Sequence, residues 1–503
     1  MKVTVTNNYL DQLDKLAWKA TCEWSSMSDT NIRGNCDDYA ELSRWFLWDK
    51  VGRAIRFSSG LQSVVFEKEL IKDATISPVI PSGASFSYPK KLRHQLNRLF
   101  SLFNNRPEEQ TTQASSFQRR AGPLVYVPVL SDRLKNSADE MIRKNICQVA
   151  FRYALQPIEG AELFQTPIES HPDLDTAASV YFSIIDGLKG FGVNLLAGDA
   201  TTLRAQIINL TAQAKSVQAE LEILRPDAIL MHGDNHPPFQ VYILAARKMG
   251  IPTIMLQHGL DCEHRYLDEA YASAIAVWGP ERLHRYREKS TLQPNISVTG
   301  NPEYDHLRAP VRIDTSGDYW LWVTRPHTPV KCYAPSRTPE EGTSIFYSLI
   351  EALQKAPGAR LVIKPHPYDY RDQYAQIIMD QGLHARVDLS MLDVHDLFPR
   401  ASLVITEDSS AGLDAMFAGK PLIHAHFAES TPTMPFVDYG AALPGFTNDQ
   451  LVESILRADD LDEVEAQVFL RGQIDFIRDF AGLCDGSSGK RFVDFVKEIL
   501  CQK

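Results

Sequence analysis

The sequence lacks the features that would assign it to several large classes of protein. Its 503 residues contain no uninterrupted apolar run near the roughly 20 residues that a membrane-spanning helix needs, and the first stretch, MKVTVTNNYLDQLDKL, has no apolar signal-peptide core. The seven cysteines are odd in number and form no CxxC pair, which argues against a disulfide framework and against a structural zinc site. We therefore expect a cytoplasmic protein with reduced thiols.

An excess of basic charge is also missing. Lys and Arg number 52 against 63 Asp and Glu, which gives a formal net charge of −11. General affinity for nucleic acid needs clustered Lys and Arg, so this balance disfavours a nucleic-acid binder but still allows a local cluster to hold a small anion. No Asp-x-Asp pair stands at a predicted strand end beside a third ligand. We therefore expect chemistry that uses no metal and no other cofactor.

The length and the order of the predicted elements indicate two domains. A chain of 503 residues is too long for one core, so two domains of about 200 to 250 residues each are expected. Residues 1–120 follow no regular pattern, whereas from residue 122 onward short apolar strands alternate with longer helical patterns, which predicts parallel α/β sheets. The polar stretch 307–317 is the predicted linker between a first domain, 1–306, and a second domain, 318–503. The last helical stretch can pack on either domain.

The predicted elements form one series on each side of this linker. In the first domain they include a strand at 227–231, a helix at 238–249 and a strand at 251–257. In the second domain, helices at 339–355, 370–382 and 410–418 alternate with apolar strands.

The stretch LVIKPHPY, at 361–368, ends a predicted strand with two prolines. Proline fixes its own φ and pushes the preceding residue toward an extended conformation, so Lys364 and His366 are expected at the carboxyl end of the strand. Open α/β sheets bind ligands at that end. We interpret His366 as a hydrogen-bond donor to a phosphate or a ribose, with Lys364 supplying positive charge. The alternative is a histidine satisfied by the backbone and a lysine in solvent.

Ser409 and Ser410 begin a predicted helix in the stretch ITEDSSAGL. The free N–H groups and the dipole at a helix start favour an anion, and two hydroxyls there can donate to phosphate oxygens. Simple helix capping by one of these residues is the alternative. Glu407 and Asp408 precede the serines and would repel a diphosphate, so we expect at least one of them to contact a ribose or a base.

Five stretches, taken together and in order, resemble enzymes of the GT-B architecture, in which two facing Rossmann-like domains enclose an interdomain active-site cleft. The stretches are ILMHGD, IPTIMLQHG, VTGNPEYD, LVIKPHP and LVITEDSSAGLDAMFAGKPLI. The resemblance implies a first domain that binds the acceptor and a second domain that binds the nucleotide donor.

Within that architecture, the pair formed by KPHP and EDSS is similar to bacterial enzymes with cytidine-nucleotide donors. These are capsule Kdo transferases, sialyltransferases and polysialyltransferases, and CDP-glycerol polymerases. The resemblance implies that His366, Pro367, Ser409 and Ser410 hold the nucleotide and phosphate of the donor. Retaining β-Kdo transferases fit best, because that family looks to place a functional aspartate after a strand of the first domain, where this chain has Asp234. The sialyltransferase Asp-Gly motif is reversed here.

A second family resembles the same residues. MHGDN, VTGNPEYD and the later Gly-Lys-Pro are similar to the non-hydrolysing UDP-GlcNAc 2-epimerases. That family has Gly-Asp-Thr where this chain has Gly233-Asp234-Asn235, and a glutamate near position 258, where this chain has LQHG.

Asp234 is the predicted catalytic carboxylate. It follows an apolar strand and precedes a helix that begins with prolines, so its side chain is expected to project into the interdomain cleft. Glycosyl transfer uses a carboxylate near the anomeric carbon as a base or as a nucleophile. The neighbouring His232 and His236 can orient it or tune its pKa, and Gly233 completes the loop. The alternative is an aspartate that caps the following helix.

His258, Arg325 and His327 complete the predicted site. His258 ends a strand at the same sheet edge as Asp234 and can contact the acceptor or a donor carboxylate. Arg325 ends the first strand of the second domain, two residues before His327, where a cation can stabilise the leaving nucleotide. The alternatives are a histidine that closes a turn and a solvated turn.

The resemblance therefore implies a glycosyltransferase that moves Kdo from CMP-Kdo onto a saccharide or lipid-linked glycan acceptor. The setting would be bacterial capsule or lipopolysaccharide O-antigen synthesis, with peripheral contact to the inner membrane or to other polysaccharide-assembly enzymes. The alternatives are a 2-epimerase-like enzyme, a sialyl- or glycerophosphotransferase, and an inactive GT-B module that binds a polysaccharide.

Overall fold

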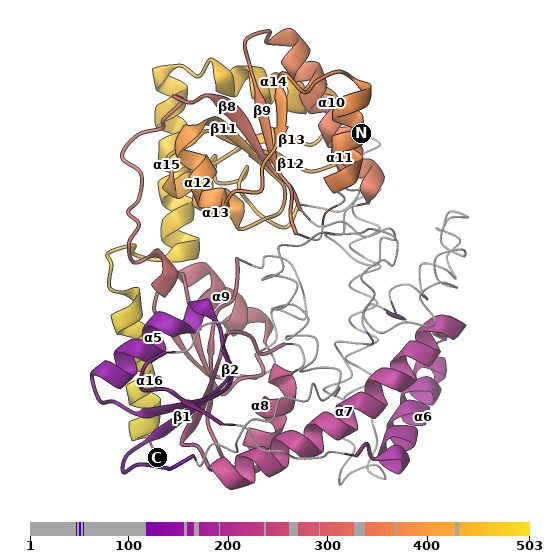
Figure 1. The fold of residues 1–503 in the computed structure, drawn as a ribbon, viewed down its shortest axis with the longest axis vertical. Helices are drawn as coiled ribbons and strands as arrows, with labels where there is room; N and C mark the ends of the chain where they lie inside the picture. The colour runs from indigo at the N-terminus through magenta and orange to yellow at the C-terminus, as the bar shows by residue number, and fades with distance from the viewer. Residues whose placement is uncertain are drawn as a thin grey trace.

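Two α/β domains are stacked along the long axis of the molecule (Figure 1). A computed structural model describes residues 117–154, 158–164, 171–190, 192–235, 238–260, 270–290, 292–325, 338–367, 371–427 and 432–502, together with residues 47, 50, 51, 54 and 369. Most of the irregular stretch 1–120 thus lies outside the described residues. Each domain is built on its own parallel sheet, which confirms the predicted fold class.

The sheet of the first domain has 7 described strands, all parallel, in the spatial order β3-β2-β1-β4-β5-β6-β7. The strands are β1 Leu124–Leu130, β2 Gln148–Ala154, β3 Glu162–Leu163, β4 Ala228–Met231, β5 Thr253–Leu256, β6 Ala274–Val277 and β7 Asn295–Val298. The helices between them are α5 Asp132–Arg143, α6 Leu174–Gly190, α7 Ala197–Leu224, α8 Phe239–Lys248 and α9 Pro280–Lys289, and the 3-10 turn η2 Pro302–Tyr304 follows β7.

Helices cover both faces of this sheet, which explains why its strands are almost continuously apolar. Successive side chains of a strand point to opposite faces. Val125 and Val127 of β1 pack in one core cluster with Leu134 of α5. Leu124 and Tyr126, between and beside them, pack in a second cluster with residues of α7 and α8.

The C-terminal helix α16, Ser488–Cys501, belongs to the first domain. Its Phe492, Val496 and Ile499 are buried in the same cluster as Val125 and Val127 of β1. Figure 1 shows this last, yellow segment beside α5 and β1. The structure therefore corrects the predicted second domain of 318–503, because the chain crosses back to the first domain before it ends.

The sheet of the second domain has 6 described strands, all parallel, in the order β10-β9-β8-β11-β12-β13. The strands are β8 Tyr319–Val323, β9 Leu361–Lys364, β10 Val387–Leu389, β11 Ala401–Thr406, β12 Leu422–Ala425 and β13 Leu443–Gly445. The helices are α10 Pro339–Lys355, α11 Arg371–Asp380, α12 Val394–Leu397, α13 Ala411–Phe417, α14 Asn448–Asp459, α15 Glu463–Ala481 and the 3-10 turn η3 Phe398–Arg400.

Local sequence signals place these helices well. The predicted helix at 339–355 is α10, and a capping box fixes its start. The Glu341 N–H donates to the Thr338 hydroxyl at 3.3 Å, and the Thr338 N–H donates to the Glu341 carboxylate at 2.8 Å. The predicted helices at 370–382 and 410–418 are observed as the shorter α11 and α13.

The predicted linker is held to the second domain by a buried lysine. Lys420 is 1% exposed, and its Nζ donates to Asp314 Oδ2 at 2.7 Å and to the Ser316 carbonyl at 3.1 Å. The Asp314 N–H in turn donates to the Gly419 carbonyl at 2.7 Å. The lysine of the Gly-Lys-Pro stretch thus fixes the path of the linker.

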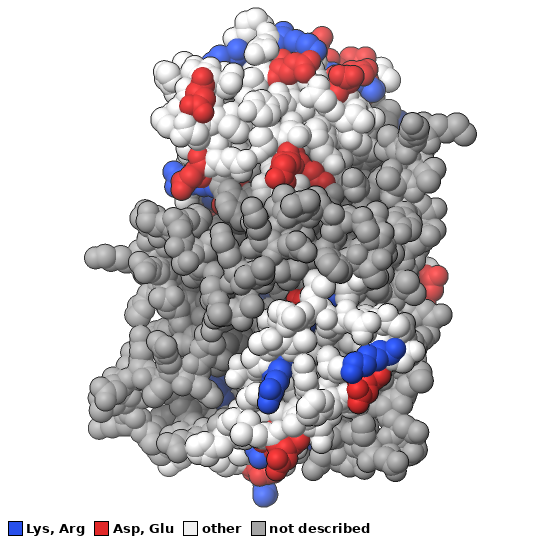
Figure 2. All heavy atoms as spheres, turned by 90° about the vertical axis from the view of Figure 1, so that its right-hand side faces the viewer, with Lys and Arg blue, Asp and Glu red and all other residues white. Residues whose placement is uncertain are grey.

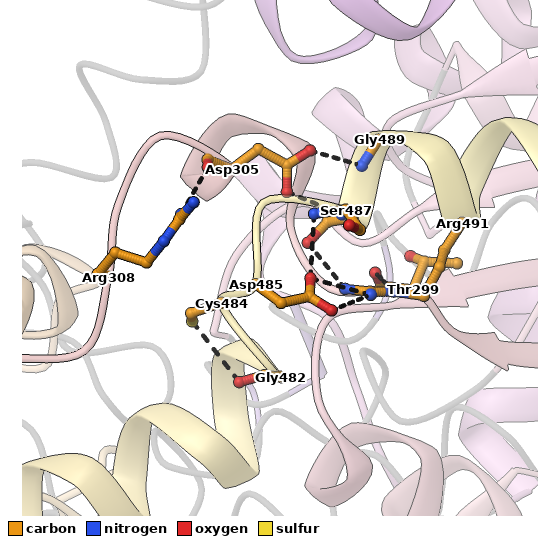
Figure 3. A network of polar contacts seen from close by, with 10 residues as sticks. Thr299, Asp305, Arg308, Gly482, Cys484, Asp485, Ser487, Gly489 and Arg491 are labelled. Carbon is orange, nitrogen blue, oxygen red and sulfur yellow. Dashed lines mark hydrogen bonds and ion pairs between the residues drawn. The ribbon is translucent and has the colours of Figure 1, made fainter.

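The loop after β7 forms the seat of α16 (Figure 3). The Asp305 carboxylate accepts from the N–H groups of Ser488 and the next residue, both at 2.8 Å, and so caps the helix. Arg491 Nε donates to the Thr299 carbonyl at 2.8 Å. A Cβ on Gly300, whose φ is +82°, would lie 2.3 Å from the Ser488 hydroxyl. The TGNPEYD stretch is therefore explained by helix docking.

A tyrosine of the same loop joins the two domains. The Tyr304 hydroxyl donates to Asp414 Oδ1 of α13 at 2.8 Å. Its ring lies 5.7 Å from the ring of Trp278 and 5.0 Å from that of Phe417. Trp278 is itself buried in a core cluster made mostly of second-domain residues, so an apolar contact connects the domains at this point.

The described surface of the second domain carries charges of both signs. Figure 2 shows basic and acidic side chains side by side at the top of the view. Arg400 pairs with Asp318 at 2.7 Å and Arg360 with Asp388 at 2.9 Å. Exposed pairs of this kind contribute about 0–1 kcal/mol each, so the apolar cores carry most of the stability. Across the described helices, none combines the length and the apolar character needed to cross a bilayer.

Candidate functional site

The carboxyl ends of β1, β4 and β5 bring two of the predicted histidines together. The Ser131 side-chain oxygen lies 3.2 Å from Nδ1 of His232. The rings of His232 and His258 stack with centroids 5.9 Å apart and an interplanar angle of 30°. Arg133, in the first turn of α5, donates to the main-chain carbonyl of His258. The first domain therefore presents an imidazole pair at its sheet edge, with His258 exposed and His232 half-buried.

The Asp234 carboxylate does not project from that edge. It is 3% exposed, and its Oδ2 accepts from the N–H groups of Tyr271 at 2.9 Å and Ala272 at 3.2 Å, just before β6. Burial raises the pKa of this carboxyl, and the two backbone hydrogen bonds act in the opposite direction. Helix α8 begins after Pro238 without a side-chain cap. The structure thus corrects both the predicted projection and the capping alternative, because this carboxylate holds the segment that leads into β6.

The neighbouring predicted residues have mixed outcomes. Gly233 is buried beside Asp234, whereas His236 and His327 lie outside the described residues. Gln257, which follows β5, also bonds to backbone: its Oε1 accepts from the Trp278 N–H at 2.8 Å. Most polar groups at this edge therefore serve the fold.

The second domain arranges charged groups along its own sheet edge. Lys364 is the last residue of β9, Arg325 follows β8, and Asp408 follows β11. These strands are neighbours in the sheet. The carboxyl ends of parallel strands share one edge, so the three side chains start from adjacent positions.

A buried network holds the KPHP stretch in place after β9. The His366 N–H donates to the Thr324 hydroxyl at 2.9 Å. That hydroxyl donates to Asp369, whose carboxylate also accepts from the Tyr374 hydroxyl at 3.0 Å. Asp369 is 2% exposed. Thr324 and Tyr374 could not be selected from the sequence, because they come from the end of β8 and from α11 and meet Asp369 only in the folded domain.

Lys364 is half-buried at the end of β9. Burial lowers the pKa of its ammonium group, and Asp393 partly offsets that effect. His366 is half-buried and Pro367 is exposed. A partly desolvated cation attracts an anion more strongly than one in bulk water, so this end of the stub suits a phosphate.

Asp408 is the centre of a compact buried cluster. Its Oδ1 accepts from the N–H groups of Thr433 at 2.9 Å and Met434 at 3.0 Å, and lies 3.1 Å from His424 Nε2. Its Oδ2 lies 2.8 Å from His426 Nδ1. Burial alone would raise the pKa of Asp408, but the contacts with the two histidines outweigh it and hold the pKa well below its usual range. Both oxygens of this carboxylate therefore have partners within the protein.

The same cluster has the composition of a metal site. One ligand atom from each of Asp408, His424 and His426 lies within 4.8 Å of the others, and all three residues are buried. This group was not predicted from the sequence, although His424 and His426 form a His-x-His pair at strand spacing. We expected metal-free chemistry because the sequence has no suitable Asp-x-Asp pair and no metal spacing among the histidines near Asp234, and neither criterion covers these three residues.

The serines at the start of α13 behave differently from each other. The Ala411 N–H donates to the Ser409 hydroxyl at 3.3 Å, so Ser409 makes a local turn contact. Ser410 is the N-cap residue, is exposed, and makes no side-chain cap hydrogen bond. Glu407, just before the serines, is buried, with 4% exposure. Beside it, Asp408 Oδ2 lies 3.9 Å from Arg325 Nη1. The Ser410 hydroxyl is thus the better placed of the two for a ligand.

Comparison with solved structures supports the architecture. The S. aureus MnaA-UDP co-structure matches with a TM-score of 0.51 and 13% identity over 76% of this chain and 98% of that chain. A putative UDP-N-acetylglucosamine 2-epimerase from Listeria monocytogenes matches with a TM-score of 0.50 and 14% identity over 76% and 98%. At this level of identity the likeness concerns the fold, and the chain has the GT-B fold that its sequence predicted.

Comparison at the sequence level finds no counterpart. No model of a protein family matches the chain, and no curated protein matches it. Function must therefore be argued from the residues of the site.

Proposed function

We propose that the protein is a sugar-nucleotide enzyme whose donor binds at the sheet edge of the second domain. The observation that carries this proposal is the set of groups at that edge. Lys364 and Arg325 supply positive charge from adjacent strands, and His366 is held beside them by the Thr324 and Asp369 network. Anionic ligands of open α/β sheets bind at such an edge, where preorganised donors face the charge without further reorganisation.

The preferred reaction is glycosyl transfer, with Kdo from CMP-Kdo as donor and a saccharide or lipid-linked glycan as acceptor. The support is the resemblance of the KPHP and EDSS stretches to cytidine-nucleotide enzymes. In this proposal His366, Pro367 and Ser410 contact the nucleotide and its phosphate, and Lys364 and Arg325 stabilise the leaving group. Ser409 and Glu407 line the same turn. The reaction would take place at the cytoplasmic face of the inner membrane, in capsule or O-antigen assembly.

The acceptor is assigned to the first domain. The exposed His258 and its stacking partner His232 are the groups proposed to contact the acceptor. Asp234 is assigned a positioning role, because its Oδ2 already accepts two backbone hydrogen bonds. A double-displacement route through Asp234 would leave both bonds on Oδ2 and require Oδ1 to reach the anomeric carbon, which the 3% exposure of this residue opposes.

The second candidate is a 2-epimerase acting on a UDP-sugar. It is favoured by the fold comparison, since one matched structure contains UDP and the other is a putative UDP-N-acetylglucosamine 2-epimerase. The same donor edge would serve both reactions. The base of the nucleotide is what separates them.

A thermal-shift panel of CMP, CDP, UDP and GDP tests the proposal directly, because a ligand that binds only the native state raises its apparent stability. We expect CMP or CDP to raise the melting temperature most. His366→Ala should remove most of the shift, as should Ser409→Ala combined with Ser410→Ala. His384→Ala, an exposed histidine away from this edge, is the matched control and should keep the full shift.

The other outcomes of the panel are equally informative. A larger shift with UDP than with CMP and CDP would favour the epimerase. Equal shifts in the wild type and in the His366→Ala protein would remove the KPHP stretch from the donor site. No shift with any nucleotide would favour the inactive polysaccharide-binding module.

A further inference from the structure

Two histidines and one aspartate meet at the carboxyl ends of β11 and β12. His424 and His426 are alternate residues at the end of β12, so their side chains leave the sheet on the same side. Asp408 reaches them from β11, which pairs with β12. Their side chains are 0%, 7% and 2% exposed, respectively.

Asp408 Oδ1 has more neighbouring nitrogen atoms within hydrogen-bond distance than it has lone pairs. A carboxylate oxygen has two lone pairs. The N–H groups of Thr433 and Met434 already occupy Asp408 Oδ1 at 2.9 and 3.0 Å, yet His424 Nε2 also lies 3.1 Å from it. A cation shared by the three residues resolves this excess, because Nε2 would then direct its lone pair to the cation and would not compete for Oδ1.

We propose that Asp408, His424 and His426 form a binding site for a divalent transition metal. The ligand atoms lie within 4.8 Å of one another, a spacing that one ion can span. Two imidazoles and a carboxylate suit Zn²⁺ and its neighbours, whereas Mg²⁺ and Ca²⁺ prefer oxygen ligands only. Three protein ligands leave a fourth position open for water or for a ligand atom. The two backbone N–H groups on Oδ1 are the outer contacts that hold the carboxylate in place.

The positive charge of Arg325 opposes the binding of such an ion. Its Nη1 lies 3.9 Å from Asp408 Oδ2, and its side chain is 24% exposed. A guanidinium and a divalent cation repel each other and compete for the same carboxylate. A metal ion must therefore compete with Arg325 for the Asp408 carboxylate, and removing this arginine should strengthen metal binding.

Titration of the chelator-treated protein with Co²⁺, followed by visible absorption, and then with competing Zn²⁺ tests the site. We expect the wild type to bind one ion in this cluster, with a parallel rise in melting temperature. His426→Gln should weaken binding by a factor on the order of 100 or more, since loss of even an outer contact costs about 10- to 100-fold. Arg325→Gln should tighten binding by about tenfold, the change that removal of one opposing charge near the ion predicts.

His384→Gln is the matched control, because His384 is exposed and lies outside the cluster. It should leave the titration unchanged. Circular dichroism and the melting temperature of each metal-free variant show that it is folded. If His426→Gln does not fold, the tighter metal binding expected from Arg325→Gln still tests the site, and unchanged metal binding in that variant would contradict it.

Two results would overturn the proposal. Equal binding by the wild type and the folded His426→Gln protein would show adventitious binding at surface histidines. No binding by the folded wild type would leave the cluster as a hydrogen-bonded anchor for residues 433–434. Neither readout involves nucleotide or sugar transfer, so failure here is distinct from failure of the proposed function.

Discussion

Asp234 in the first domain and Asp408 in the second occupy equivalent positions and use the same device. Asp234 follows β4, which pairs with β1, and Asp408 follows β11, which pairs with β8; β1 and β8 are the first strands of the two sheets in chain order. In each, one carboxylate oxygen accepts from two consecutive backbone N–H groups, 271–272 in the first domain and 433–434 in the second. In both domains, a buried aspartate thus holds a backbone segment that lies later in the chain.

The surroundings of the two aspartates differ, and the difference shifts their pKa values in opposite directions. Burial raises the pKa of Asp234, whereas in Asp408 the contacts with His424 and His426 outweigh burial and lower the pKa. The adjacent strand is followed by Gln257 in the first domain, whereas in the second domain it carries His424 and is followed by His426. One topological position thus holds an aspartate that anchors backbone in the first domain and an aspartate that also contacts two histidines in the second.

The largest expected effect is a difference between two equivalent substitutions. Asp408→Asn should lower the free energy of unfolding at pH 7 by about 3–5 kcal/mol, because it removes one partner of a buried charged group. Asp234→Asn should change it by about 1 kcal/mol or less, since the amide oxygen can accept the same two N–H groups and no buried charge remains to be solvated. Urea denaturation of both variants measures the difference. Equal losses would end the distinction between the two sites.

Asp234→Ala separates anchoring from catalysis in the first domain. It leaves the N–H groups of Tyr271 and Ala272 buried and unpaired, which should cost about 2–4 kcal/mol. Asp234→Asn should retain both stability and at least about a tenth of the turnover, since a positioning role survives in the amide. A stable but inactive Asp234→Asn protein, with turnover reduced on the order of 10³-fold, would restore the carboxylate as a catalytic group.

The linker pair adds a pH dependence to the second domain. Burial would raise the pKa of Asp314, but hydrogen bonds from Lys420 and Ser316 lower it to about 2. A lowered pKa contributes stability that is present above the unfolded value of about 4 and is lost as the pH falls toward the folded value. Buried Lys420 loses its partner in Asp314→Asn. The free energy of unfolding of the wild type should therefore be about 2 kcal/mol higher than that of the variant at pH 6, and the difference should be much smaller near pH 2.5.

Urea titrations of both proteins across this pH range supply the measurement. A gap between wild type and variant that stays constant down to pH 2.5 would contradict the ion pair as its source.

The smallest expected effects are on ligand binding, with the nucleotide affected by a second-domain residue and the acceptor by a first-domain residue. Arg325→Ala should weaken nucleotide binding by about tenfold, and the loss should shrink at high salt because the lost attraction is partly screened. His258→Ala should leave nucleotide affinity unchanged and raise the KM for the acceptor. Calorimetric titration and steady-state kinetics distinguish the two. A nucleotide defect in His258→Ala would place the donor across both domains.

Much of the fold could be read from local patterns. The continuous apolar runs predicted β4 and β5, and the Thr-x-x-Glu signal marks the start of α10, because these features depend on neighbours within a few residues. The prolines around His366 likewise predicted a strand end at β9. The return of α16 to the first domain could not be predicted, since its amphipathic face would suit either core.

The candidate site shows the same division. The sequence by itself determined that Lys364, Arg325, Asp234 and Asp408 stand at strand ends, since strand length and proline placement are local properties. The tertiary structure decided what each side chain meets. The strand order brings Asp234 to an N–H group 37 residues away and Asp408 to a histidine 16 residues away. Whether a buried carboxylate becomes an anchor, an ion-pair partner or a metal ligand depends on those long-range neighbours, because burial makes every unsatisfied charge costly.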